Sequence, residues 1–144
     1  MTLLNALEET RRLEPIEINE DNIKEIKYEG IIAMTMASGG AMGEPNGFEA
    51  VDENMQLYHS NFVSGKVDYK KLEKAFPILN YSCDRSEGGW RRISLGMGNY
   101  LLLREKYYEP FIDRVKLDLG GNYGRGNLYI NWYNILQKVV LIKK

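Results

Sequence analysis

The chain has almost no cysteine or histidine, the residues on which disulfide bonds and most zinc sites depend. Its 144 residues include one cysteine, Cys83, and one histidine, His59. A single cysteine excludes an internal disulfide and a cysteine-built zinc site, and a single histidine excludes a mechanism that needs two histidines from one chain. No apolar run approaches the ~20 residues that span a bilayer, and the apolar stretch at the N-terminus is too short for a signal peptide. We therefore expect a cytoplasmic protein with no membrane partner, metal or cofactor.

Apolar and aromatic residues, in contrast, are plentiful enough for one core. Hydrophobic residues make up 44% of the chain and charged residues 27%, with ten Tyr and two Trp, which argues against a disordered chain. A chain of this length buries roughly two-thirds of the surface that it exposes when unfolded. We predict that residues 1–144 form a single domain.

Charge is distributed very unevenly along the sequence. Residues 1–53 hold 12 acidic and 4 basic side chains, a formal charge of −8, whereas residues 54–144 hold 8 acidic and 15 basic ones, a formal charge of +7. The net charge of −1 hides this asymmetry. Because a surface of one sign attracts a partner of the opposite sign, the pattern favours a binding function over catalysis.

The hydrophobic pattern predicts an α+β fold, in which a mainly antiparallel sheet of about five strands carries helices packed on it. Strands are indicated by apolar or alternating runs between turn residues, at 31–37, 48–52, 55–62, 90–95 and 100–104. Helices are indicated by apolar spacing and by capping residues, at 3–13, 69–76 after Asp68, 105–116, and onward from an Asn127 cap. Since neighbouring strands pair as hairpins, no βαβ crossover is expected.

Some stretches allow more than one interpretation. Residues 16–29 are typical of a short strand or turn followed by a second strand, and the apolar end of the chain, 139–142, fits a helix or a strand. Loops are predicted at 38–47, 80–89 and 120–126, and the first and last of these are rich in glycine. A regulatory domain that senses a small ligand through the two glycine-rich loops is one functional alternative.

The single histidine has a structural and a catalytic interpretation. His59 lies on the predicted strand 55–62, on the same face as Met55, Leu57 and Asn61. A partly buried, hydrogen-bonded imidazole is the favoured interpretation. The alternative is a small hydrolase-like enzyme whose cleft contains His59 and nearby carboxylates. Cys83 has no recognisable base beside it, so we interpret it as an incidental thiol.

Basic and aromatic residues also gather on two predicted strands. Arg91, Arg92 and Arg104 accompany Trp90 and Tyr100, and basic and aromatic residues together on a sheet can bind nucleic acid. The net charge of the chain opposes that function, and pairing of these arginines with the N-terminal acids inside the fold explains them equally well. We therefore expect no nucleic-acid partner.

Two segments resemble the sequences of small bacterial immunity proteins. One is the glycine-rich stretch 38–47 with the strand after it and Leu57–Asn61; the other is Gly89–Asn99, followed by a strand and a Tyr-rich helix. Together they are similar to the immunity proteins of contact-dependent growth inhibition and related polymorphic toxin systems, over roughly residues 30–115. The resemblance implies an antitoxin without catalysis of its own, which binds and neutralises the C-terminal domain of a cognate toxin.

The resemblance also suggests how the acidic residues act. A toxin nuclease usually has a basic active site because its substrate is polyanionic, and an inhibitor can present carboxylates that mimic phosphates and speed association. An inhibitor that binds beside the active site needs no such mimicry, and both modes stay open. The candidate partner-facing acids come from 14–29 and 44–53, namely Glu17, Glu20, Asp21, Glu25, Glu44, Glu49 and Asp52. The competing interpretation of the acidic run is an ordinary solvated face.

Overall fold

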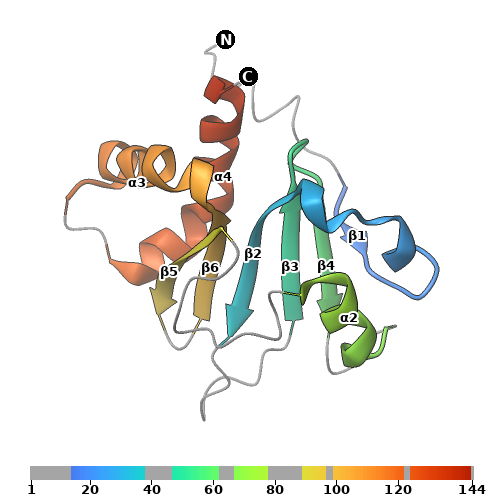
Figure 1. Ribbon diagram of the computed structural model, residues 1–144. Helices are drawn as coiled ribbons and strands as arrows, with labels where there is room; N and C mark the ends of the chain where they lie inside the picture. Colours follow the sequence, from blue (N-terminus) through green and yellow to red (C-terminus); the bar gives the residue numbers. More distant parts are fainter. Residues whose placement is uncertain are drawn as a thin grey trace.

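A six-stranded sheet organises the chain (Figure 1). The computed structural model describes residues 14–37, 47–61, 67–77, 89–96, 99–121 and 124–143. The strands are β1 (Ile16–Glu17), β2 (Ile31–Ala37), β3 (Gly47–Asp52), β4 (Leu57–Asn61), β5 (Trp90–Gly96) and β6 (Asn99–Arg104). Their order in the sheet is β1-β4-β3-β2-β6-β5. Every pairing is antiparallel except that of β1 with β4.

The α+β class and the local strand pairing are confirmed. The β2–β3–β4 meander and the β5–β6 hairpin follow the predicted alternation. The sheet has one strand more than the predicted five, because residues 16–17 add to the edge of β4. The remainder of the acidic run forms no second strand; it contains two 3-10 helices, η1 (Ile23–Glu25) and η2 (Tyr28–Gly30).

The turn between β3 and β4 is longer than predicted. Met55 lies before β4 rather than in it, with φ of 62°, and its side chain is fully buried. Asp52 holds this turn together: its carbonyl accepts a hydrogen bond from the Met55 amide at 2.9 Å, and its Oδ1 accepts from the amides of Asn54 and Gln56 at 2.9 and 3.0 Å. The carboxylate of Asp52 therefore replaces the ladder hydrogen bonds that the turn interrupts.

Three helices are described, α2 (Tyr69–Ala75), α3 (Glu105–Leu119) and α4 (Arg125–Lys143). The Asp68 side chain makes no capping hydrogen bond, although it occupies the predicted position before α2. The prediction that Asn127 caps the last helix is wrong, because α4 begins at Arg125. The strand alternative for 139–142 is wrong as well, since the helical spacing continues through Val139 and the helix runs on to Lys143.

Helices cover both faces of the sheet and create two apolar cores. α3 and α4 pack on the β5–β6 half of one face, around Leu101, Phe111 and Trp132. On the opposite face α2 and η1 pack over Met34, where Leu72 contributes to the second core. On the face that carries α3 and α4, Val51 and Met55 join the same core, and the Tyr133 hydroxyl of α4 donates to the Met55 carbonyl at 2.6 Å. The β3–β4–β1 part of this face also holds a row of polar side chains.

Several predictions fall on parts of the chain that the structure does not describe. These are the helix at 3–13, most of the loops at 38–47 and 80–89, and the individual residues Glu44 and Cys83. Gly47 and Gly89 are described, in β3 and just before β5. Within the described ranges, no helix is both long and apolar enough to cross a membrane.

Candidate functional site

The predicted partner-facing acids do not form one cluster. Glu17 and Glu49 lie on one face of the sheet, Glu20 and Asp21 in the turn after β1, and Glu25 and Asp52 at one end of the sheet. These three places differ in burial, in hydrogen bonding and in the charges around them.

Glu17, His59 and Glu49 form a row across three neighbouring strands. In the strand register Glu17 on β1 lies opposite His59 on β4, and His59 lies opposite Glu49 on β3. Registered residues on adjacent strands put their side chains on the same face, with Cβ atoms about 5 Å apart. Thr35 on β2 continues the row, and its Oγ1 accepts a hydrogen bond from the Glu49 amide at 3.2 Å. The predicted strand 55–62 thus placed His59 beside Leu57 on this face correctly, and the sheet adds the two carboxylates.

Glu49 has the most perturbed carboxylate of this row. Burial raises the pKa of Glu49 above its ordinary 4.5, and the charge of His59 opposes that rise. A carboxylate with a raised pKa beside an imidazole is an arrangement found in catalytic sites as well as in structural ones. Neither Glu49 nor His59 lines the depressions at the end of the sheet or the one beside α3.

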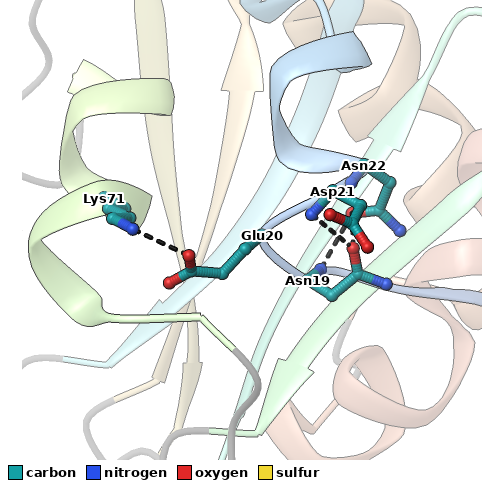
Figure 2. A network of polar contacts seen from close by, with 5 residues as sticks. All are labelled: Asn19, Glu20, Asp21, Asn22 and Lys71. Atoms are coloured by element: carbon teal, nitrogen blue, oxygen red, sulfur yellow. Dashed lines mark hydrogen bonds and ion pairs between the residues drawn. The ribbon is translucent and has the colours of Figure 1, made fainter.

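A rigid turn presents Glu20 and Asp21 (Figure 2). Asn19 Oδ1 accepts hydrogen bonds from the amides of Asp21 and Asn22 at 2.8 and 2.9 Å, and Asn22 Oδ1 accepts one from the Asn19 amide at 2.8 Å. These reciprocal bonds fix the backbone without using a charged side chain. Glu20 pairs with Lys71 of α2 at 2.8 Å, and both side chains are 54% exposed. The Asp21 side chain is exposed.

Glu25 and Asp52 meet at the end of the sheet where β3 ends and β2 begins. They line an open depression of about 250 Å³ together with Lys27, Glu53 and Tyr58. The Tyr58 hydroxyl donates to Asp52 Oδ2 at 3.3 Å; burial raises the pKa of Tyr58, and the charge of Asp52 raises it further. Asp52 therefore has a structural role in this region, while Glu25 faces solvent.

A second depression of about 310 Å³ continues the same end of the sheet past Glu53. Its charged lining residues are Glu29, Glu53, Arg104, Glu105 and Lys106. We call the combined surface the acidic end, and define it by its carboxylates: Glu25, Glu29, Asp52, Glu53 and Glu105. Glu29 and Glu53 were not among the predicted site residues. The sequence signal for them was their place in the two acidic stretches, but only the fold brings η2 beside the β3–β4 turn.

Lys27, Arg104 and Lys106 also line the acidic end, and the last two contact other groups. Arg104 donates from Nε to the Ile31 carbonyl and from Nη2 to the Tyr28 carbonyl, both at 2.9 Å. Its guanidinium also lies 4.1 Å from the centre of the Trp90 ring. Lys106 lies 5.1 Å from the Tyr107 ring centre. The side chains of Glu25, Glu29 and Glu53 are exposed and form no ion pair with another described residue.

The basic strand residues are stacked on aromatic rings. Arg91 lies 3.9 Å from the Tyr108 ring centre and pairs with Glu105 at 3.3 Å, and Arg92 lies 4.6 Å from the Tyr100 ring centre. The acid that Arg91 contacts belongs to α3, not to the N-terminal acidic run. No group of three or more metal-ligating side chains occurs in the part of the chain that the structure describes.

Comparison of the chain with models of known protein families, with curated proteins and with solved structures finds no match. Its function is therefore inferred from its own residues and their geometry.

Proposed function

We propose that this chain is a cytoplasmic immunity protein, which binds and neutralises a cognate bacterial toxin domain through its acidic end. The toxin would be a nuclease, because a cleft built for a polyanionic substrate is basic. The inhibitor contributes carboxylates and needs no cofactor and no catalytic group of its own.

The observation that carries this proposal is the gathering of exposed carboxylates at one end of the sheet. Glu29 and Glu53 come from different parts of the chain and line the same depression. Glu53 also lines the depression that contains Glu25. Because these side chains stand on a 3-10 helix and a hydrogen-bonded turn, little ordering is needed on binding, which favours affinity.

The acidic turn after β1 provides a second contact area for the same partner. Asp21 is exposed on a backbone that Asn19 and Asn22 hold in place. Exposed charges at the rim of an interface act mainly on the rate of association and on its dependence on salt. We therefore assign the larger share of the binding energy to the acidic end.

The first experiment is capture of the partner. Tagged protein is incubated at low salt with lysate of the native strain, and bound proteins are identified by mass spectrometry. The expected result is the C-terminal domain of a secreted toxin, released by high salt. Recovery of no toxin domain by well-folded protein would overturn the proposal.

The second experiment locates the binding surface by calorimetry with the captured toxin domain. The triple variant Glu25→Lys, Glu29→Lys and Glu53→Lys should weaken binding by about tenfold or more and reduce its dependence on salt. The matched control makes the same change of charge at exposed acids elsewhere, through Asp68→Lys, Glu109→Lys and Asp113→Lys. Equal losses in both variants would show that net charge, and not the acidic end, determines affinity.

A further inference from the structure

The β3–β4 turn carries a methionine where turns of this kind ordinarily carry glycine. The Asp52 amide donates to the Gln56 carbonyl at 3.2 Å, and the Met55 amide donates to the Asp52 carbonyl at 2.9 Å. Three-residue hairpin turns closed in this way end in a left-handed residue, which is usually glycine. Within the described ranges, Met55 is the only residue other than glycine with a positive φ, of 62°. For such a residue this conformation is disfavoured by about five- to thirtyfold.

Two interactions hold Met55 in the left-handed conformation. Its side chain is fully buried in the core that also contains Trp132 and Leu136 of α4. Its carbonyl accepts a hydrogen bond from the Tyr133 hydroxyl at 2.6 Å. Burial raises the pKa of Tyr133 above its ordinary 10, and the charge of Asp52 raises it further, so the hydroxyl keeps the proton that it donates.

The same turn carries part of the acidic end. Glu53 and Asn54 occupy its first two positions and are exposed, and Glu53 lines both depressions. Asp52 fixes the turn from within, because its Oδ1 accepts hydrogen bonds from the amides of Asn54 and Gln56. Tyr133 is the side chain of α4 that fixes it from the core. The direction in which the Glu53 side chain leaves the sheet therefore depends on the backbone conformation that Tyr133 holds at the end of the turn.

We infer that Tyr133 is a positioning residue of the acidic end. Its hydroxyl keeps Met55 in the left-handed conformation and thereby keeps Glu53 in the orientation that the toxin domain recognises. The tyrosine acts through Met55 and not as a contact with the partner. A turn that is held in its bound shape before association loses less freedom on binding, which favours affinity. For this consequence in binding, the inference rests on the proposed function.

The test compares the wild type with Tyr133→Phe on the full chain. Phenylalanine keeps the ring, whose centre lies 5.8 Å from that of Trp132, and loses only the hydroxyl, so the variant should fold. One net hydrogen bond favours the native turn by about two- to tenfold, which is comparable with the intrinsic preference of Met55 against it. We therefore expect half or more of the variant molecules to leave the native turn. NMR relaxation dispersion at the amides of residues 53–56 measures this population, and the wild type should show one conformation.

Calorimetry with the captured toxin domain measures the consequence for binding. Because only the native turn binds, the affinity falls in proportion to its population, by about two- to fivefold in Tyr133→Phe. Tyr129→Phe is the matched control, since it removes the same hydroxyl one turn earlier in α4, at a residue that is 50% exposed; it should alter neither the turn nor the affinity. The Glu105 amide, which donates to the Gly89 carbonyl at 2.7 Å, is the internal reference and should show no second conformation.

The inference is overturned if the wild-type turn already populates a second conformation, if Tyr133→Phe keeps a single one, or if Tyr129→Phe has the same effect. An equal response at Glu105 would show a general loss of stability and would also overturn it. If the turn changes in Tyr133→Phe but the toxin domain binds as tightly as before, the positioning role fails while the proposed function stands. Capture of no toxin domain overturns the proposed function, whereas the NMR measurement needs no partner and still decides whether Tyr133 holds the turn.

Discussion

Replacement of Arg104 is expected to destabilise the fold more than any surface charge change. This guanidinium links three elements: it donates to the carbonyls of Tyr28 and Ile31 at 2.9 Å each, and it lies 4.1 and 5.1 Å from the ring centres of Trp90 and Tyr28. Trp90 in turn donates from its indole nitrogen to the Tyr28 hydroxyl at 3.0 Å. Arg104 therefore fixes η2 against the sheet.

The magnitude follows from the groups that Arg104→Met would leave behind. Each hydrogen bond to a charged group contributes about 1.5–3 kcal/mol, and each cation–π contact about 0.5–1 kcal/mol. Methionine keeps much of the packing of the arginine stem, and water can reach a partly exposed carbonyl. We therefore expect a loss of about 3–5 kcal/mol, a large fraction of the ~5–15 kcal/mol that stabilises a domain.

Urea unfolding followed by circular dichroism measures this loss. With an m-value of about 2 kcal/mol per molar, the midpoint should fall by about 2 M. Arg91→Met is the matched control, because Arg91 also stacks on a tyrosine but is 41% exposed and pairs at 3.3 Å with Glu105, which is 60% exposed; it should cost about 1 kcal/mol or less. If Arg104→Met stays within about 1 kcal/mol of the wild type, or if both variants lose equally, then Arg104 does not stabilise the fold through the carbonyls that it binds.

Two further predictions concern the polar row and a helix end. Burial raises the pKa of Glu49, so the contribution of this side chain to stability is full below pH 4.5 and is lost as pH rises through the folded pKa. Glu49→Gln should therefore raise the urea midpoint at pH 7.5, with a smaller gain at pH 4. An equal gain at both pH values would contradict burial of the carboxylate as the cause. Gly120 ends α3 with φ of 84°, and a Cβ added at this position would meet nothing within 4 Å, so Gly120→Ala should cost about 1 kcal/mol in thermal unfolding through backbone strain alone. Gly121, which also has open space but no positive φ, should tolerate alanine with little change.

The sequence predicted the strands and turns that are determined by residues close together in the chain. Alternation identified β5 and the turn residues identified the β5–β6 hairpin, because both depend on neighbouring residues. β1 matches the short strand that was one of two interpretations for the start of 16–29, but it was not counted in the sheet, since two residues carry no periodic signal and the parallel pairing with β4 depends on a contact more than 40 residues away. The start of α4 was placed too late because Asn127 is a good cap by type, although the chain is already helical at Arg125.

The candidate site was predictable in composition but not in arrangement. The acidic run indicated which residues to consider, and Glu25 is indeed exposed at the acidic end. No periodicity indicates that η2 lies beside the β3–β4 turn, so Glu29 and Glu53 required the fold. Asp52 shows the converse: its carboxylate binds the backbone of its own turn, a role that a charge count does not distinguish from partner binding.

The fold also explains why the charge asymmetry of the sequence persists on the folded surface at the acidic end. Arginines of the basic half lie over aromatic rings contributed largely by that same half, Arg91 over Tyr108 and Arg92 over Tyr100. Arg104 is the exception that reaches the acidic half, but it binds carbonyls there instead of carboxylates. Because these guanidinium groups form no ion pair with Glu25 or Glu29, both carboxylates stay exposed at the acidic end, where the proposed basic partner would supply the opposite charge.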